Sequence, residues 1–500
     1  MLSNSVHQRF SGLVIENRPF SGGRYFEPRA GRRLEKKCPA DGRRLPFLFA
    51  CDAQDVDRVV NDAERAYQVG NWRNLDVSEK QSVLRRWAAL IEAEIPYLAY
   101  LDALETGRAY RNFVEDSIPK ALEALRWFTE AVDKFHAVHN RRSPLELSFV
   151  SHEPLGVVGI ITPWNDPLVI ALWKTSPALL MGNSVVIKPA EQSSFSTIRI
   201  AELAVQAGLP DGVFNVVTGI GEVVGRALTL HQKIRGIFFT GSSEVGKQIL
   251  VGAGESNMKK VGLECGGKSA FIISKHCDCL PLAAETLARS MFYNQGQICS
   301  APSRLIVHRE VSEEFYSLLF AEAQAYAPAD PFLENTLVGS LVSRDQYRRV
   351  QGYIELGLSA GYRYYQVGRH EGLSVEDCFV QPIIFIDVPS DSPLARDEVF
   401  GPVLVTHEFD CMEKALVLAN DSPFGLAASI WTSNLDEALK VAQRLEAGVV
   451  HVNSYGDDDN TAPFGGVKES GIGRDKSIFA FQDYSNLKAT WIKLGAGDLA

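Results

Sequence analysis

The 500-residue sequence has no apolar segment of the roughly 18 residues that a membrane-spanning helix needs. Its first residues, MLSNSVHQRF, lack the apolar core of a secretory signal. The eight cysteines follow no repeated spacing, and the pair Cys277 and Cys279 has no second matching pair, so neither a disulfide framework nor a metal site is expected. These absences predict a reduced, soluble, cytoplasmic protein without a membrane partner.

Positive charge is also scarce relative to negative charge. Lys and Arg total 51 against 61 Asp and Glu, which gives a net charge of −10. An acidic chain of this kind is not expected to bind nucleic acid or an anionic membrane, whereas a cationic ligand is compatible with it. The length predicts two or three domains, and the sequence contains no internal repeat and no low-complexity tract.

Short runs rich in Val and Ile alternate with segments of helix length from residue 156 onward. The runs are residues 156–161, 184–188, 213–217, 234–239, 269–273, 304–307, 383–388, 427–431 and 448–453. Nearly continuous apolar strands separated by helices are typical of parallel sheets that are covered on both faces. The sequence therefore predicts an α/β fold with two such domains.

The segments outside this alternation have other patterns. The first 50 residues, rich in Arg, Gly and Pro, predict irregular or short extended structure. Helices are predicted over about 56–67 and 118–135, and another after Ser78, with Ser78 and Gln81 as its capping-box pair. Residues 136–154 predict a hairpin. The run 488–494 predicts a strand apart from both domains, available to another sheet such as one in a second subunit.

A polar, glycine-containing segment, FYNQGQICS, surrounds Cys299 at residues 292–300. Such runs seldom build a core and more often place backbone at a functional site. A free cysteine is usually a small buried hydrophobe, so Cys299 alone indicates little. The motifs elsewhere in the chain favour a catalytic nucleophile at this position.

Two of these motifs follow predicted strands directly. TPWNDP at 162–167 places Asn165 beyond the end of a strand, where α/β proteins bind ligands. KPAE at 188–191 ends the next strand, so that Lys188 and Glu191 are positioned to meet the ribose hydroxyls of NAD. Each motif also has a structural explanation, since prolines end strands and charged residues face solvent.

Three more motifs contain glycines. FTGSSEVG at 239–246 is a strand, a turn and a helix start, whose N–H groups are suited to a pyrophosphate. LECGGKSA at 263–270 puts Glu264 beside two glycines, and EVFGP at 398–402 adds Glu398 and Phe400. The glycines of 219–225 are the weakest signal, because such a pattern often serves only helix packing.

In this order the motifs resemble the aldehyde dehydrogenase superfamily over nearly the whole chain. The run PFGGVKESGIGRDKS at 463–477 is most similar to the branch that oxidises γ-glutamyl-γ-aminobutyraldehyde and related polyamine-derived aldehydes. The resemblance implies a Rossmann-like NAD-binding domain (1–136 and 156–266) and an α/β catalytic domain (267–467). It also implies a small β oligomerisation element (137–155 and 483–497) in a homodimer or homotetramer.

The resemblance further implies roles for the matching residues. Cys299 is the nucleophile, Asn165 the oxyanion donor and Glu264 the general base. NAD is the cofactor, favoured over NADP, and its contacts are Trp164, Lys188, Glu191, Gly221, Gly225, Ser242, Glu398 and Phe400. The substrate contacts are Asp166, Tyr293, Asp458 and Phe464.

Two acidic positions depart from the family pattern. Asp166 replaces the usual aromatic residue after Asn165, and the acidic run 457–459 falls where relatives have a tunnel aromatic, most directly at Asp458. These changes predict a substrate with a positive charge remote from the aldehyde, such as 4-aminobutyraldehyde or 4-guanidinobutyraldehyde. The alternative is that the run is a solvated loop and that Asp166 pairs with a protein cation such as Lys174.

Other functions are weighed against this one. A non-catalytic structural member of the fold is disfavoured because Cys299, Asn165 and Glu264 are all present. A CoA-acylating semialdehyde dehydrogenase is disfavoured because Glu264 favours hydrolysis of the thioester. A dehydrogenase of neutral aliphatic or aromatic aldehydes stays open.

Overall fold

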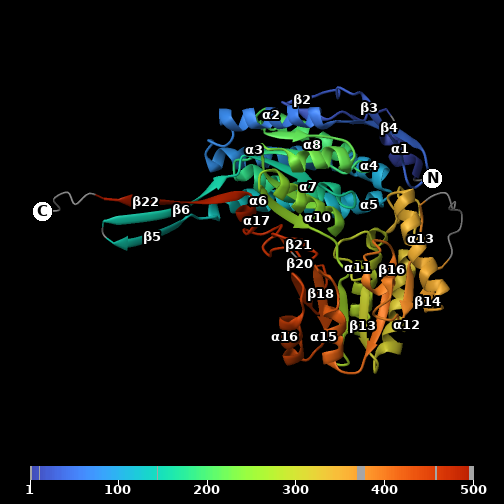
Figure 1. Cartoon of the computed structure of the whole chain (residues 1–500). Coiled ribbons are helices and arrows are strands. Elements are labelled where there is room, and N and C mark those ends of the chain that lie inside the picture. The colour runs from blue at the N-terminus through green and yellow to red at the C-terminus, as the bar shows by residue number, and fades with distance from the viewer. Residues whose placement is uncertain (1–2, 11, 144, 369–377, 457–458, 495–500) are drawn as a thin grey trace.

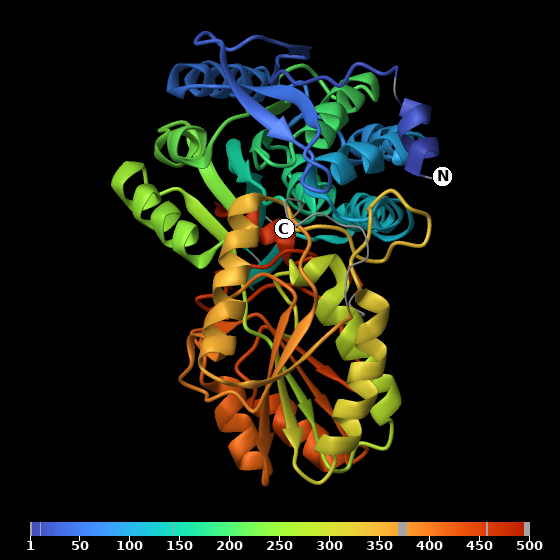
Figure 2. The ribbon, with the colours of Figure 1, turned by 90° about the vertical axis from the view of Figure 1, so that its right-hand side faces the viewer.

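The computed structural model describes residues 3–10, 12–143, 145–368, 378–456 and 459–494. This part of the chain forms two helix-covered sheets and a projecting arm (Figure 1). In Figure 2 the first sheet and its helices make the upper half, coloured blue to green, and the second sheet and its helices make the lower half, yellow to orange. The predicted α/β fold is confirmed.

The first sheet has a parallel centre and antiparallel edges. Its order is β2 (Arg24–Tyr25), β1 (Phe20–Ser21), β9 (Phe214–Val216), β8 (Ser184–Lys188), β7 (Val157–Ile161), β10 (Ile234–Thr240), β11 (Lys260–Glu264) and β21 (Gly471–Ile472). The strands from β9 to β11 in this order run parallel, so β7, β8, β10 and β11 end at the same edge. Strand β11 was not predicted, because its sequence KVGLE lacks a run of Val and Ile.

Helices cover both faces of this sheet, and large side chains such as Trp87, Phe128 and Phe214 fill the space between them. They are α1 (Ser3–Phe10), α2 (Ala53–Val69), α3 (Val77–Ala93), α4 (Ile95–Thr106), α5 (Tyr110–Asn112), α6 (Ile118–Ala131), α7 (Pro167–Leu180), α8 (Phe195–Gln206), α9 (Arg226–Leu230), α10 (Ser243–Ser256) and α17 (Ala480–Asp483). The predicted capping pair of α3 is wrong. Asp76 precedes the helix, and its N–H donates to the Glu79 carboxylate (3.0 Å).

The second sheet is parallel except at one edge. Its order is β14 (Arg363–Gln366), β15 (Ile383–Ile386), β16 (Val403–Phe409), β13 (Arg304–His308), β12 (Ala270–Ile273), β18 (Ala427–Trp431) and β19 (Val449–Val452), with β14 antiparallel. Its helices are α11 (Leu280–Phe292), α12 (Ser312–Ala323), α13 (Arg344–Ser359), α14 (Pro393–Arg396), α15 (Met412–Asn420) and α16 (Leu435–Arg444). Two short ribbons, β3 (Arg32–Lys37) with β4 (Arg44–Ala50) and β17 (Phe424–Gly425) with β20 (Val467–Lys468), complete the strands.

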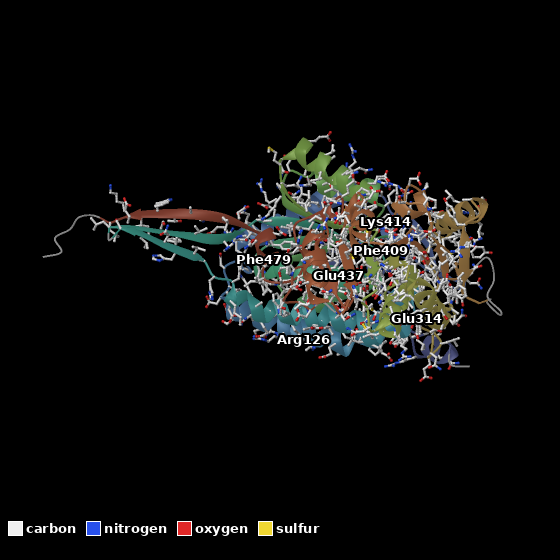
Figure 3. The ribbon with its side chains drawn as sticks, turned by 90° about the horizontal axis from the view of Figure 1, so that it is seen from below. Arg126, Glu314, Phe409, Lys414, Glu437 and Phe479 are labelled. Carbon is white, nitrogen blue, oxygen red and sulfur yellow. The ribbon has the colours of Figure 1, made fainter. Side chains whose placement is uncertain are left out.

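The arm consists of β5 (Val138–Ser143), β6 (Glu146–Pro154) and β22 (Ser485–Lys493). It extends beyond the body both in Figure 1 and from below in Figure 3, where Phe479 lies near its base. The predicted hairpin at 136–154 is confirmed. The predicted C-terminal strand is β22, which pairs with β6 of its own chain from Ser485 opposite Pro154 to Lys493 opposite Glu146.

Within the described ranges, no helix combines the length and the apolarity that crossing a bilayer requires.

Candidate active site

A cavity of about 530 Å³ opens where β10 and β11 of the first sheet end. Its wall includes Thr240 and Glu264 from those strand ends, Asn165 from the loop before α7, and Cys299 from the loop after α11. The carboxyl ends of parallel strands are the usual place for ligands in α/β proteins. The structure thus brings together the three residues predicted to be catalytic.

The loop that carries Cys299 has an unusual backbone. Asn294 (φ 51°), Gln295 (φ 57°) and Gly296 (φ 66°) are successive left-handed residues that begin one residue after α11. Left-handed backbone is unfavourable for Asn and Gln, and such strain often marks functional sites. The buried Gln295 side chain donates to the Gly339 carbonyl (2.7 Å), which helps to hold this conformation. The polar residues of this segment therefore hold the backbone that leads to Cys299.

The side chain of Asn165 is fixed by the same loop. Its amide nitrogen donates to the Gln297 carbonyl (3.0 Å), and the Asn294 amide donates to the Asn165 carbonyl (3.2 Å). An asparagine amide carries two hydrogens, so one hydrogen remains for a ligand in the cavity. Asn165 is thus bound to the carbonyl of Gln297, two residues before Cys299, and keeps one amide hydrogen for a ligand.

The thiol of Cys299 is half-buried and lies in a negative environment. Burial raises its pKa to about 12, and the carboxyl groups of Glu398 and Glu264 add to this effect. The thiolate is the nucleophilic form of cysteine. In the absence of ligands the group is a neutral thiol near pH 7, and it needs a base to become reactive.

Glu264 supplies a carboxyl group with the properties of a base. It ends β11 nearly buried, and its Oε2 has no hydrogen-bond partner in the described structure. Burial, followed by repulsion from Asp475, raises its pKa well above the ordinary value. Gly465 (φ 157°) makes room for it, because a Cβ there would lie 2.5 Å from Glu264 Oε1.

An ion pair lies behind Glu264. Lys174 Nζ is 2.8 Å from Asp475 Oδ2, and both side chains are nearly buried. The Lys174 charge lowers the pKa of Glu264 while the Asp475 charge raises it. The suggestion that Lys174 pairs with Asp166 is wrong, because Lys174 is bound to Asp475.

Asp166 pairs with a different cation, Arg108. Asp166 Oδ1 lies 3.3 Å from Arg108 Nη1 and also accepts a hydrogen bond from Ser117. The buried Arg108 donates from Nη2 to Tyr293 Oη (2.9 Å), and the Tyr293 hydroxyl donates to Asp116 (2.9 Å). Arg108, Asp116, Asp166 and Tyr293 line the cavity. Asp166 is therefore neutralised by a protein cation, as the alternative interpretation held, although the cation is not Lys174.

Arg108 and Asp116 were not predicted as site residues from the sequence. Asp116 lies in a single π-helical turn, Phe113–Ser117, between α5 and α6. Such turns are frequent at functional sites, but no residue pattern marks them in advance. The local sequence predicted only the helix that follows.

Aromatic side chains form another part of the wall. Phe464, a predicted substrate contact, packs against Trp173 with ring centroids 5.8 Å apart. Lys476 Nζ lies 4.7 Å from the centroid of the Trp173 ring. Tyr455 also lines the cavity and donates to the Ser300 carbonyl. Asp458, the other predicted contact, lies outside the described residues.

Of the predicted cofactor residues, Lys188, Glu191 and Gly225 lie near the end of β8, and Ser242 lies after β10 at the start of α10. Glu191 Oε2 is 3.1 Å from Lys188 Nζ, and a Cβ on Gly225 would lie 4.0 Å from Lys188 Cδ. Gly221 begins the π-helical turn before α9, with open space beside it. Ser242 caps α10 by accepting from Val245 N–H (3.4 Å). A helix start with free N–H groups and a nearby carboxylate suit a phosphate and a ribose.

Glu398 and Phe400 lie on the other side of the Cys299 loop. Gly267 N–H donates to Glu398 Oε1 (3.2 Å), and a Cβ on Gly266 would lie only 2.1 Å from the Glu398 carboxylate oxygens. Burial raises the pKa of Glu398 to about 7. The rings of Trp164 and Phe400 meet edge to face, 5.2 Å apart. The two glycines after Glu264 thus allow this close approach.

Comparison with known proteins agrees with this geometry. The sequence profile described as the aldehyde dehydrogenase family matches residues 25–490. The chain belongs to the aldehyde dehydrogenase family. The NADP/NAD-dependent aldehyde dehydrogenase PuuC of Escherichia coli (strain K12) is 43% identical to this aldehyde dehydrogenase over 484 residues, 97% of each chain.

Solved aldehyde dehydrogenase structures share the fold over nearly the whole chain. An indole-3-acetaldehyde dehydrogenase complexed with NAD+ superposes with a TM-score of 0.97 at 42% identity, covering 99% of this chain and 100% of the other. The γ-glutamyl-γ-aminobutyraldehyde dehydrogenase of Burkholderia cenocepacia J2315 superposes with a TM-score of 0.95 at 41% identity, with the same coverage. The predicted family and its polyamine-related branch are confirmed.

Proposed function

We propose that this aldehyde dehydrogenase uses Cys299 as nucleophile, Asn165 as oxyanion donor and Glu264 as general base to oxidise an aldehyde to a carboxylic acid with NAD. The observation that carries the proposal is that these three groups share one cavity. Asn165 is hydrogen-bonded to the Cys299 loop, and the Glu264 carboxyl has an unpartnered oxygen.

The chemistry begins with the neutral Cys299 thiol. The thiol proton passes to solvent water, and the thiolate forms a bond to the aldehyde carbon. The oxygen that becomes negative is stabilised by the second amide hydrogen of Asn165 and by the Cys299 N–H, since one such donor contributes about 2.7–4 kcal/mol. Bound NAD supplies the hydride acceptor, which leaves a thioester on Cys299. Glu264 then accepts a proton from the water that hydrolyses this thioester.

The residues around β8 fit a dinucleotide. The start of α10 would hold the pyrophosphate. Lys188 and Glu191 would hold the ribose near β8, and Glu398 would hold the ribose near Cys299. A carboxylate at Glu191 accepts hydrogen bonds from ribose hydroxyls and repels a 2′-phosphate, which supports NAD over NADP. The NAD+ complex of the indole-3-acetaldehyde dehydrogenase supports the same cofactor.

The proposed substrate is a polyamine-derived aminoaldehyde, such as γ-glutamyl-γ-aminobutyraldehyde, 4-aminobutyraldehyde or 4-guanidinobutyraldehyde. The name of the Burkholderia cenocepacia relative supports this class. Because Arg108 already neutralises Asp166, we consider Asp116 and Glu115 as the cavity acids for a cationic end. Their partners Lys120 (2.7 Å) and Arg111 (2.6 Å) are exposed, although Arg108 also lies 3.9 Å from Asp116. An exposed ion pair of this kind is weak and easily exchanged.

A neutral aromatic aldehyde is a second candidate substrate. The Trp173 and Phe464 rings on the cavity wall would pack against an aromatic group, and one structural relative is an indole-3-acetaldehyde dehydrogenase.

The two candidates are distinguished by kcat/KM for 4-aminobutyraldehyde and for an uncharged aldehyde of similar length. If the substrate is cationic, the kcat/KM preference for the aminoaldehyde should narrow about tenfold in Asp116→Asn and less in Asp166→Asn. Asp133→Asn, an exposed acid outside the cavity, is the control. If the wild type prefers the neutral aldehyde, the aminoaldehyde proposal is wrong.

The catalytic assignment is tested by replacing the two central residues. Cys299→Ala is expected to abolish turnover while NADH binding is retained, because the thiol forms the covalent bond and does not hold the cofactor. Glu264→Gln is expected to keep a burst of NADH followed by a slow steady rate. The matched control is Cys277→Ala, which replaces a buried cysteine in the core beside the second sheet. Wild-type turnover of Cys299→Ala would exclude the mechanism.

We also propose the domain division given by the resemblance: NAD-binding domain 1–136 and 156–266, catalytic domain 267–467, and oligomerisation element 137–155 and 483–497. The separate sheets and the projecting arm support it. The arm has an exposed edge strand with exposed Leu487 and Trp491. Such an edge is an aggregation hazard unless a partner covers it, which favours a homodimer or homotetramer.

A further inference from the structure

A buried lysine joins the N-terminal ribbon to the body of the first sheet. Lys36 lies in β3 beside an irregularity in the pairing with β4. The residues on either side of it are exposed, whereas only 7% of its own side chain is exposed. Its Nζ lies 2.5 Å from Oε1 of Glu105 on α4, which is fully buried. Buried charges are costly unless they are paired, and here the Lys36 and Glu105 charges are paired with each other.

The same pair contacts the turn between β8 and α8. Glu105 accepts hydrogen bonds from the N–H groups of Ser194 (3.1 Å) and Phe195 (2.8 Å) at the start of α8. Lys36 Nζ donates to the main-chain carbonyl of Glu191. Lys36 and Glu105 thus hold the main chain of the turn that carries Glu191 from its buried side.

Glu191 has a second, open side. Its carboxylate contacts Lys188 Nζ (3.1 Å) and is 31% exposed. We infer that Lys36 and Glu105 are positioning residues for the cofactor, which fix the backbone at Glu191 so that its carboxylate faces the ribose. This inference rests on the proposed contact between Glu191 and NAD. A carbonyl buried without its donor would be unfavourable, so the turn would rearrange if Lys36 were removed.

The test is to measure NADH affinity in Lys36→Met by fluorescence titration, together with kcat and KM for NAD. Loss of one hydrogen bond to a charged group predicts an increase of about tenfold in the NADH Kd and in the KM for NAD. The kcat at saturating NAD should stay within about twofold of the wild-type value. The ratio of kcat/KM for NAD to kcat/KM for NADP should fall. Lys37→Met, the exposed neighbour on the same strand, is the matched control and should bind NADH normally.

A second variant keeps the test informative if Lys36→Met leaves Glu105 unpaired and fails to fold. Lys36→Met/Glu105→Gln removes both buried charges while an amide oxygen remains to cap α8, and it should show the same increase in Kd. A wild-type Kd in either variant, or an equal loss in Lys37→Met, would overturn the inference. Failure of the proposed Glu191 contact is distinguishable, because Glu191→Gln would then bind NADH normally in an otherwise unchanged protein.

Discussion

The ion pair behind Glu264 gives a prediction in which two substitutions that break one contact have opposite effects. Lys174 and Asp475 are 2.8 Å apart and nearly buried. At an effective dielectric constant of 20 their attraction is about 6 kcal/mol before desolvation is subtracted. Removing one partner leaves a buried, unpaired charge, which typically costs about 3–5 kcal/mol. Lys174→Met and Asp475→Asn are therefore both expected to lower the midpoint of urea denaturation.

The effects on catalysis should differ in sign. Glu264 acts as a base only when ionised, so deacylation accelerates as the pH rises through its pKa. Lys174→Met removes a charge that lowers this pKa and leaves Asp475, which raises it, unpaired. Asp475→Asn does the reverse. A neighbouring charge contributes on the order of 1–2 kcal/mol at such a site, which corresponds to about one pH unit in each direction.

The assay is the steady-state rate after the NADH burst, measured from about pH 5 to 10, since a persisting burst shows that deacylation is the slow step. The acidic limb of the plot of steady-state rate against pH should move to higher pH in Lys174→Met and to lower pH in Asp475→Asn. Lys80→Met, which replaces another buried lysine outside the cavity, is the control and should not move it. If both ion-pair variants shift the limb in the same direction, the electrostatic account of Glu264 is wrong.

Gly465→Ala should slow the steady rate about 100-fold, as expected for a displacement of about 1 Å, because the new Cβ would lie 2.5 Å from Glu264 Oε1; full activity would show that Glu264 does not need this space. Glu191→Gln should narrow the preference for NAD over NADP, measured as a ratio of kcat/KM values, whereas an unchanged ratio would remove Glu191 from cofactor recognition. Light scattering should give an oligomer for the wild type and a smaller mass for Leu487→Lys/Trp491→Lys, two exposed positions on β22. A wild-type monomer would contradict the proposed assembly.

Much of the fold was determined by local sequence. The parallel strands β7, β8 and β10 were predicted because buried parallel strands read as runs of Val and Ile, while β11 was missed because KVGLE has no such run. The positions of Cys299, Asn165 and Glu264 were also local signals, since each lies in a short motif next to a predicted strand or turn. Their predicted roles came from the order of these motifs, which resembles that of the aldehyde dehydrogenase family.

Only the tertiary structure decided how the charged residues pair. Lys174 binds Asp475, which is 301 residues away in the sequence, and Asp166 binds Arg108 rather than Lys174. Likewise β22 pairs with β6 of its own chain, more than 300 residues earlier. Nothing in a local pattern specifies such contacts, because an ion pair or an edge pairing depends on which segments the folded core brings together. The sequence by itself thus predicted which residues carry the chemistry, and the fold determined which charged residues pair with one another.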